Sequence, residues 1–244
     1  MFRIVAFLLL GLACSVPAAE TRAQPSAGDA LRGPGREVMN AVQRLYPGDH
    51  ARIMEALRRH AAEHPDDVSG RAALGRRLLL DFFRLRADGL GNAPGPLVND
   101  IVGRHLLLLR LLAKDDTALC ADLADNLLIG RFDLPAFYQD RATSLSVSIV
   151  EAASEGEKSP RDPARAGLAA EDATRWYEEL LRVEPSSDIQ AAIAADSAGA
   201  SGSPEMQCRV GAAIFGAMEH LSPEQAANVG AFFLAQTLAE PGHE

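Results

Sequence analysis

The sequence contains few aromatic residues, and this shortage limits the fold classes that the chain can adopt. Aromatic residues make up 5% of its 244 residues, while alanine and leucine dominate, so the composition favours helices over strands. No stretch convincingly alternates apolar and polar residues as a half-buried strand does. The chain also has no glycine-rich phosphate loop, G-x-S-x-G elbow or C-x-x-C pair, which are the usual signatures of nucleotide, hydrolase and thiol redox chemistry.

The charge is predominantly acidic, with a formal net charge of −9 at pH 7. A chain this acidic is a poor partner for nucleic acid or an anionic membrane, so we expect neither. The charge is uneven, because residues 36–86 are net basic and residues 151–244 are net acidic. The basic half could dock an anionic partner or the acidic half of the same chain, but solvated arginine-rich helix faces are the simpler interpretation.

The N-terminus carries the pattern of a secretory signal peptide. A short basic start precedes an apolar stretch at residues 4–16, and small residues follow. Residues 1–23 therefore predict a signal peptide that is too short for a stable membrane anchor. Cleavage after Ala23 satisfies the requirement for small residues, with Ala18 and Ala19 as alternatives.

An alternative interpretation of this N-terminal segment is lipidation at Cys14. The residues Leu12-Ala13-Cys14 resemble the end of a bacterial lipobox, although Gly11 stands where a branched aliphatic residue is usual. A lipid on Cys14 would tether the protein to a membrane surface without embedding it. The sequence thus predicts a periplasmic or secreted protein, with a lipid-anchored protein as the alternative.

The mature chain reads as one all-α domain. Residues 24–35 are rich in Gly, Pro, Ala and Ser and predict a disordered lead-in. Residues 36–240 then predict a single irregular bundle of about nine or ten helices. The glycine- and proline-rich residues 89–96 predict a loop within it, and the polar residues 154–163 form a candidate boundary between two subdomains.

The most apolar stretch after the leader starts at Pro96 and predicts the central helix. Leucines cover it on nearly all sides, so other helices should surround it. Asp100 and Arg104 are among the polar residues that interrupt it, so we expect no transmembrane span in the mature chain. His105 falls on this helix and is interpreted as a core group, with a pocket shared with Asn99 and Asp100 as the alternative.

The two cysteines of the mature chain, Cys120 and Cys208, each lie about one turn into a predicted helix, after the capping residues Asp116 and Ser203. In an oxidising compartment two such cysteines tend to pair, so we predict a disulfide, with two buried free thiols as the alternative. Closing a loop of roughly 90 residues would lower the entropy of the unfolded chain and so stabilise the folded state by about 4.5 kcal/mol.

The strongest catalytic motif is His60-Ala61-Ala62-Glu63-His64, which matches the H-x-x-E-H spacing of inverted zinc proteases. On a helix, His60 and His64 share a face and could bind zinc, with Glu63 as general base. Pro65 ends that helix at once, and histidines near a helix C-terminus are favoured by the dipole alone. We therefore interpret these histidines as structural or surface residues.

These observations predict an exported, non-enzymatic helical protein that acts as a periplasmic binding or scaffolding module. Its partner is an unknown protein or small molecule, and we assign no catalytic, cofactor-binding or metal-binding residue. A zinc-dependent hydrolase using the H-x-x-E-H helix and a lipid-tethered accessory lipoprotein are the alternatives.

Overall fold

The computed structural model describes residues 34–131, 134–159, 167–196 and 203–239. The predicted signal peptide, the lipidation at Cys14 and most of the lead-in lie outside the described residues. Within these ranges, none of the helices is both long and apolar enough to cross a membrane.

Every regular element in the described ranges is helical, as predicted for an all-α fold. The elements, in chain order, are α1 Pro34–Leu45, α2 Pro47–Glu63, α3 Val68–Arg84, α4 Ala87–Gly91, α5 Gly95–Asp115, α6 Thr117–Asn126, α7 Ala136–Lys158, α8 Ala170–Val183, α9 Ser187–Asp196, α10 Pro204–Ala217, the short 3-10 helix η2 Met218–His220, and α11 Pro223–Ala239.

Two boundaries differ from the sequence-based expectation. The short helix α4 occupies part of residues 89–96, where we predicted a loop, so the loop prediction is wrong there. Helix α4 packs closely against α7 at the point where Gly89 meets Gly156, since neither residue has a side chain. A Cβ on Gly156 of α7 would overlap the carbonyl oxygen of Gly89. Helix α7 also continues to Lys158, into the polar stretch proposed as a boundary.

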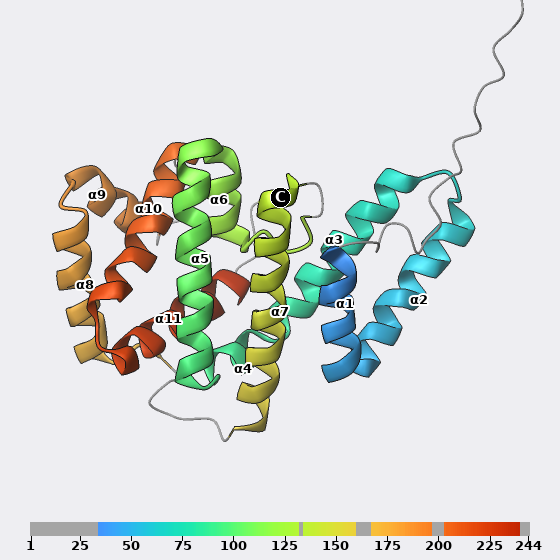
Figure 1. The fold of residues 1–244 in the computed structure, drawn as a ribbon, viewed down its shortest axis with the longest axis horizontal. Coiled ribbons are helices and arrows are strands. Elements are labelled where there is room, and N and C mark those ends of the chain that lie inside the picture. The colour runs from blue at the N-terminus through green and yellow to red at the C-terminus, as the bar shows by residue number, and fades with distance from the viewer. Residues whose placement is uncertain (1–33, 132–133, 160–166, 197–202, 240–244) are drawn as a thin grey trace, which may run out of the picture.

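The arrangement is an elongated bundle with α5 at its centre (Figure 1). Helix α5 contributes eight buried residues and packs against α6, α7, α10 and α11. Helices α8 and α9 lie at one end, and the hairpin of α2 and α3 projects at the other. The prediction of a surrounded central helix is therefore confirmed.

A disulfide joins Cys120 of α6 to Cys208 of α10, as predicted. The two Cα atoms are 5.1 Å apart and 88 residues separate the cysteines in sequence. Asp116 and Ser203 cap the two helices, each accepting a hydrogen bond from the backbone N–H three residues on, at 3.0 and 3.3 Å. The sequence thus set where both helices begin and how far into each helix its cysteine lies.

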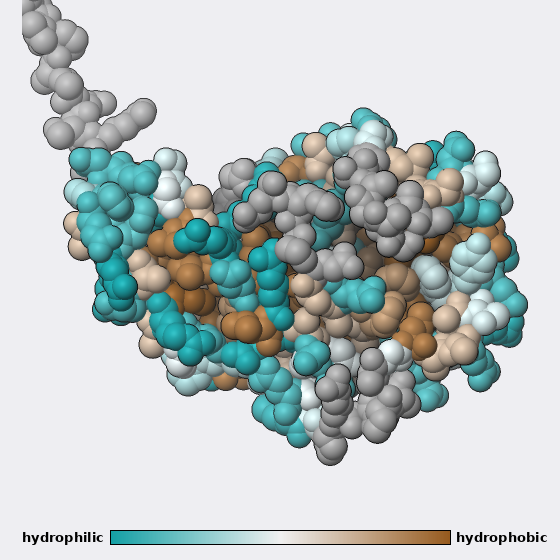
Figure 2. Space-filling model, turned by 180° about the vertical axis from the view of Figure 1, so that it is seen from behind, coloured by the Kyte–Doolittle hydropathy of each residue, from teal (hydrophilic) through white to brown (hydrophobic). Residues whose placement is uncertain are grey.

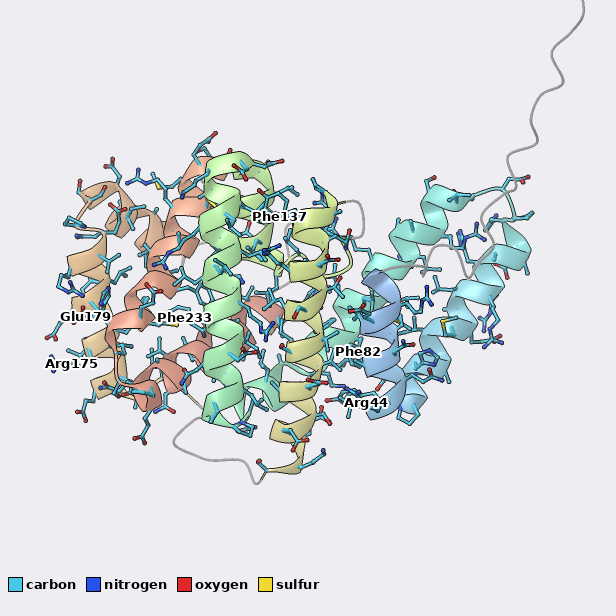
Figure 3. All side chains as sticks on the ribbon, viewed as in Figure 1. Arg44, Phe82, Phe137, Arg175, Glu179 and Phe233 are labelled. Carbon is cyan, nitrogen blue, oxygen red and sulfur yellow. A yellow bond between two sulfur atoms is a disulfide. The ribbon has the colours of Figure 1, made fainter. Side chains whose placement is uncertain are left out.

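The N-terminal helices are joined to the body by an arginine clamp, which comprises Tyr46, Asp49, Phe82, Arg86 and Glu157. The Arg86 guanidinium lies 4.5 Å from the centre of the Tyr46 ring and pairs with Asp49 and, at 3.3 Å, with Glu157. The buried Phe82, labelled in Figure 3, packs edge-on against Tyr46 with ring centres 5.2 Å apart. Burial raises the pKa of the Tyr46 phenol to about 12, so this group stays neutral.

Candidate functional site

A small cavity lies where α1, α3 and α7 meet the segment that follows α6. Its volume is about 10 Å³, close to the space that one water molecule needs. We call this cavity the α7 pocket. It is lined by Val38, Leu79, Phe83, Leu128, Gly130, Arg131, Gln139, Ala142, Thr143 and Ser146.

Helix α7 presents three buried polar side chains to the pocket: Gln139, Thr143 and Ser146. Their spacing of four and three residues places them on one face of the helix. Their exposed fractions are 6%, 4% and 6%. Gln139 donates to the carbonyl oxygen of Arg131 at 3.2 Å, but Thr143 Oγ1 has no hydrogen-bond partner. A buried hydroxyl without a partner is uncommon, so Thr143 is the most informative residue of the pocket.

The segment that follows α6, which lines the pocket through Leu128, Gly130 and Arg131, has an unusual backbone. Leu127 and Leu128 adopt left-handed φ angles of 55° and 53°, although both side chains are fully buried. Residues in such conformations each cost about 1–3 kcal/mol, and they cluster at ligand clamps and switch regions. Gly130 is also left-handed, with φ 70°, and a Cβ there would come within 2.9 Å of Arg76 Cγ.

The charged groups beside the pocket are paired with one another. Asp122 on α6 lies 2.5 Å from Arg131 and 3.4 Å from Arg76. All the side chains that line the pocket, apart from Arg131, are uncharged. The interior of the pocket therefore offers neutral hydrogen-bonding groups on one side and aliphatic or aromatic carbon on the other.

The residues of the H-x-x-E-H motif do not assemble a metal site. His60 and His64 are neighbours, with ring centres 5.0 Å apart, and His60 Nε2 lies 3.5 Å from Asp67. Asp67 is engaged as the N-cap of α3, and its hydrogen bond from the Gly70 N–H lowers its pKa. The described ranges contain no group of three or more His, Cys, Asp or Glu residues placed to hold a metal ion. Helix α2 ends at Glu63, at the point that Pro65 predicted.

His105 is a core residue, as the favoured interpretation held. Its side chain is completely buried, neither ring nitrogen has a hydrogen-bond partner, and its ring centre lies 4.2 Å from that of Phe215. Desolvation lowers its pKa to about 3. Asn99 and Asp100 do not form a pocket with it, since Asn99 binds the carbonyl of Pro223 and Asp100 pairs with Arg104 on the surface.

Apolar side chains also gather on the back face of the molecule, beside the projecting α2–α3 hairpin (Figure 2). Exposed apolar residues on other helices are spread out, including Leu107 on α5 and Phe137 on α7, at 53% and 52% exposed. Such surfaces do not specify a chemistry, whereas the α7 pocket does, because it combines apolar walls with converging polar groups. The pocket is therefore the candidate site.

Comparison of the chain with protein families, with curated proteins and with solved structures finds no match.

Sequence reasoning did not identify the pocket residues. Ala142, Leu145 and Ile149 mark the apolar face of α7, and the polar Gln139, Thr143 and Ser146 lie on the same side. Polar residues repeated at helical spacing within an apolar face were the signal that could have identified them.

Proposed function

We propose that the chain is an exported helical binding module that takes a small neutral ligand in the α7 pocket. The observation that carries the proposal is the unpaired, buried hydroxyl of Thr143, set between Gln139 and Ser146 on one helix face. Small-molecule sites combine mostly apolar walls with a few converging polar groups, and the pocket has this composition.

The ligand class follows from the charges around the pocket. Asp122 pairs with both Arg76 and Arg131, so the Arg131 guanidinium that lines the pocket is already engaged. A charged ligand buried against Thr143 and Ser146 would exchange its hydration for neutral hydroxyl groups and an arginine already paired with Asp122, which is unfavourable. A neutral amide or alcohol can instead bond to these groups and place its carbon against Phe83 and the other apolar walls.

The size of the pocket requires the wall to move when a ligand larger than water enters. At about 10 Å³ the pocket is far smaller than the roughly 300–1,000 Å³ of ordinary ligand sites. We infer that the wall formed by Leu128, Gly130 and Arg131 is the part that moves, because Leu127 and Leu128 hold a strained backbone that is kept in place only by their burial in the core. Helix α7, at the opposite side, is long and held along its length by α1, α4 and α5.

Export is supported by the leader pattern at residues 1–23 and by the disulfide between Cys120 and Cys208. Disulfides form and persist in oxidising compartments and are rare in reducing ones. The module therefore acts in the periplasm or outside the cell, with its C-terminal half covalently fastened.

Ligand-observed NMR on the oxidised mature protein tests the binding proposal. The probes are acetamide and 2-propanol, with acetate and isopropylammonium as charged counterparts. We expect the neutral probes to bind and the charged ones to fail. The variant Ala142→Leu fills the pocket and should abolish binding, whereas Ala73→Leu makes the same change at an exposed position of α3. Equal binding to both variants, or no binding of neutral probes to the wild type, would contradict the proposal.

Mass spectrometry of the full-length chain, produced in a Gram-negative host and recovered from the periplasm, tests export. An intact mass that starts at Gln24 and is lower by two hydrogen atoms because of the disulfide is the expected result. A diacylglyceryl adduct on Cys14 would replace the free module with its lipid-anchored alternative. Retention in the cytosol with an intact Met1 would overturn export.

A further inference from the structure

The hydroxyl of Thr143 behaves differently from those of two other helical threonines. Thr174 Oγ1 and Thr237 Oγ1 each donate to the carbonyl four residues back, Ala170 at 2.8 Å and Phe233 at 2.9 Å. This back-bonding is the usual way in which a threonine within a helix satisfies its hydroxyl. Thr143 Oγ1 forms no such bond although it is fully buried, and its side chain lines the α7 pocket.

We propose that Thr143 Oγ1 binds a neutral hydroxyl group inside the α7 pocket, supplied either by a water molecule or by a small alcohol. The volume of about 10 Å³ suits one such group. A buried water needs two to four polar partners, and Gln139 and Ser146 flank Thr143 on the same face. The inference rests on the pocket of the proposed function and names Thr143 Oγ1 as the atom that forms a hydrogen bond with the ligand.

The pocket favours an uncharged occupant for a second reason. Its apolar side is closed by Val38 of α1 and by Leu79 and Phe83 of α3, which offer no hydrogen bonds. A hydroxyl group can bond to Thr143 on one side and tolerate these carbons on the other. An ion would need a full shell of polar partners, which these walls do not provide.

Water-to-protein NOE spectroscopy on the oxidised mature protein tests the inference, with the Ala142 methyl as reporter. Ala142 lines the pocket and remains in every variant. We expect a contact with a long-lived water in the wild type and in Thr143→Ser, which keeps the hydroxyl, and its loss in Thr143→Val. Thr237→Val is the matched control and should leave the contact unchanged, because Thr237 lies on α11. Crystal structures of the wild type and Thr143→Ser provide a second measurement if Thr143→Val does not fold.

A methanol titration distinguishes the two sources of the hydroxyl. Shifts of the Ala142 and Leu128 methyl signals in the wild type, absent in Thr143→Val, would show that an organic hydroxyl replaces the water. A water contact without these shifts would assign the site to water alone. In that case the hydroxyl site stands while the proposed ligand-binding function fails.

A dry pocket would overturn the inference. The evidence would be no water contact at Ala142, no ordered water beside Thr143 in the crystal, and a rise in the melting temperature of Thr143→Val. A rise of about 4 °C or more is expected if the valine relieves a hydroxyl that has no partner at all.

Discussion

Around α5, α6 and α10 the chain combines a disulfide with almost purely apolar packing, whereas around α1, α4 and α7 the apolar packing includes buried polar groups and ion pairs. In the first region Cys120, Cys208 and Leu109 are at most 2% exposed. In the second, Arg86 bridges Asp49 and Glu157, and α7 carries its polar face inward. The same bundle is thus stabilised by a disulfide in one region and includes buried polar groups and ion pairs in the other.

This difference indicates which region of the bundle can offer hydrogen-bonding groups to a ligand. Among its described side chains, the apolar and cross-linked core leaves few hydrogen-bonding groups without a partner, namely the ring nitrogens of His105 and Asn99 Oδ1 on α5. The region around α7 keeps such groups and also carries ion pairs, among them the exposed pair of Arg44 and Glu151 at 2.6 Å. Exposed pairs of this kind add little stability. The pocket therefore lies in the region whose interior includes polar side chains, beside the cross-linked one.

Removal of the disulfide should have the largest effect on stability. The double variant Cys120→Ala/Cys208→Ala is expected to lose about 4.5 kcal/mol of unfolding free energy, since the bridge closes a long loop in the unfolded chain. Urea denaturation measures the loss, and reduced wild-type protein should match the variant. Hydrogen exchange should show the greatest loss of protection in α6 and α10. A loss below about 1 kcal/mol would show that packing alone holds this region.

The second prediction concerns His105 and the pH dependence of stability. The unfolded chain binds a proton near pH 6.5, whereas the folded chain resists protonation until about pH 3. Between these values the unfolded state binds more protons, so stability falls as pH falls. From pH 7 to pH 4 the loss due to His105 should be about 3 kcal/mol.

The variant His105→Leu should lose this part of the pH dependence, as measured by urea unfolding at each pH. His220→Leu is the matched control for replacing a histidine with leucine, because His220 is exposed on η2. If the profiles of His105→Leu and the wild type are parallel down to pH 4, His105 is not the group that makes the apolar region sensitive to acid.

The features that the sequence predicted are those with local causes. The caps at Asp116 and Ser203 depend on a backbone N–H only three positions away in each helix. The apolar periodicity of α5 indicated its central place directly. The disulfide followed from compartment and cysteine count, because two cysteines leave only one intramolecular pairing.

The pocket could not be predicted because it is made by contacts between distant segments. Nothing near Thr143 indicates that α1 and α3 will enclose its hydroxyl. The left-handed conformations of Leu127 and Leu128 could not be predicted either, because leucine rarely adopts this conformation. Their side chains are held in the core, and this tertiary burial outweighs the local backbone preference.

The smallest predicted effect tests how α7 is held in the polar region. In Gly156→Ala the new Cβ would overlap the carbonyl of Gly89, so α4 and α7 must separate, at a cost of about 2 kcal/mol. Gly75→Ala is the matched glycine, since its Cβ would lie 3.8 Å from the Leu57 side chain, and higher helix propensity should stabilise that variant by up to about 1 kcal/mol. Urea denaturation of both variants should therefore give changes of opposite sign. If Gly156→Ala is neutral, the backbone contact between α4 and α7 contributes little, and the Arg86 clamp and the packing of α1 against α7 fasten the N-terminal helices to the body.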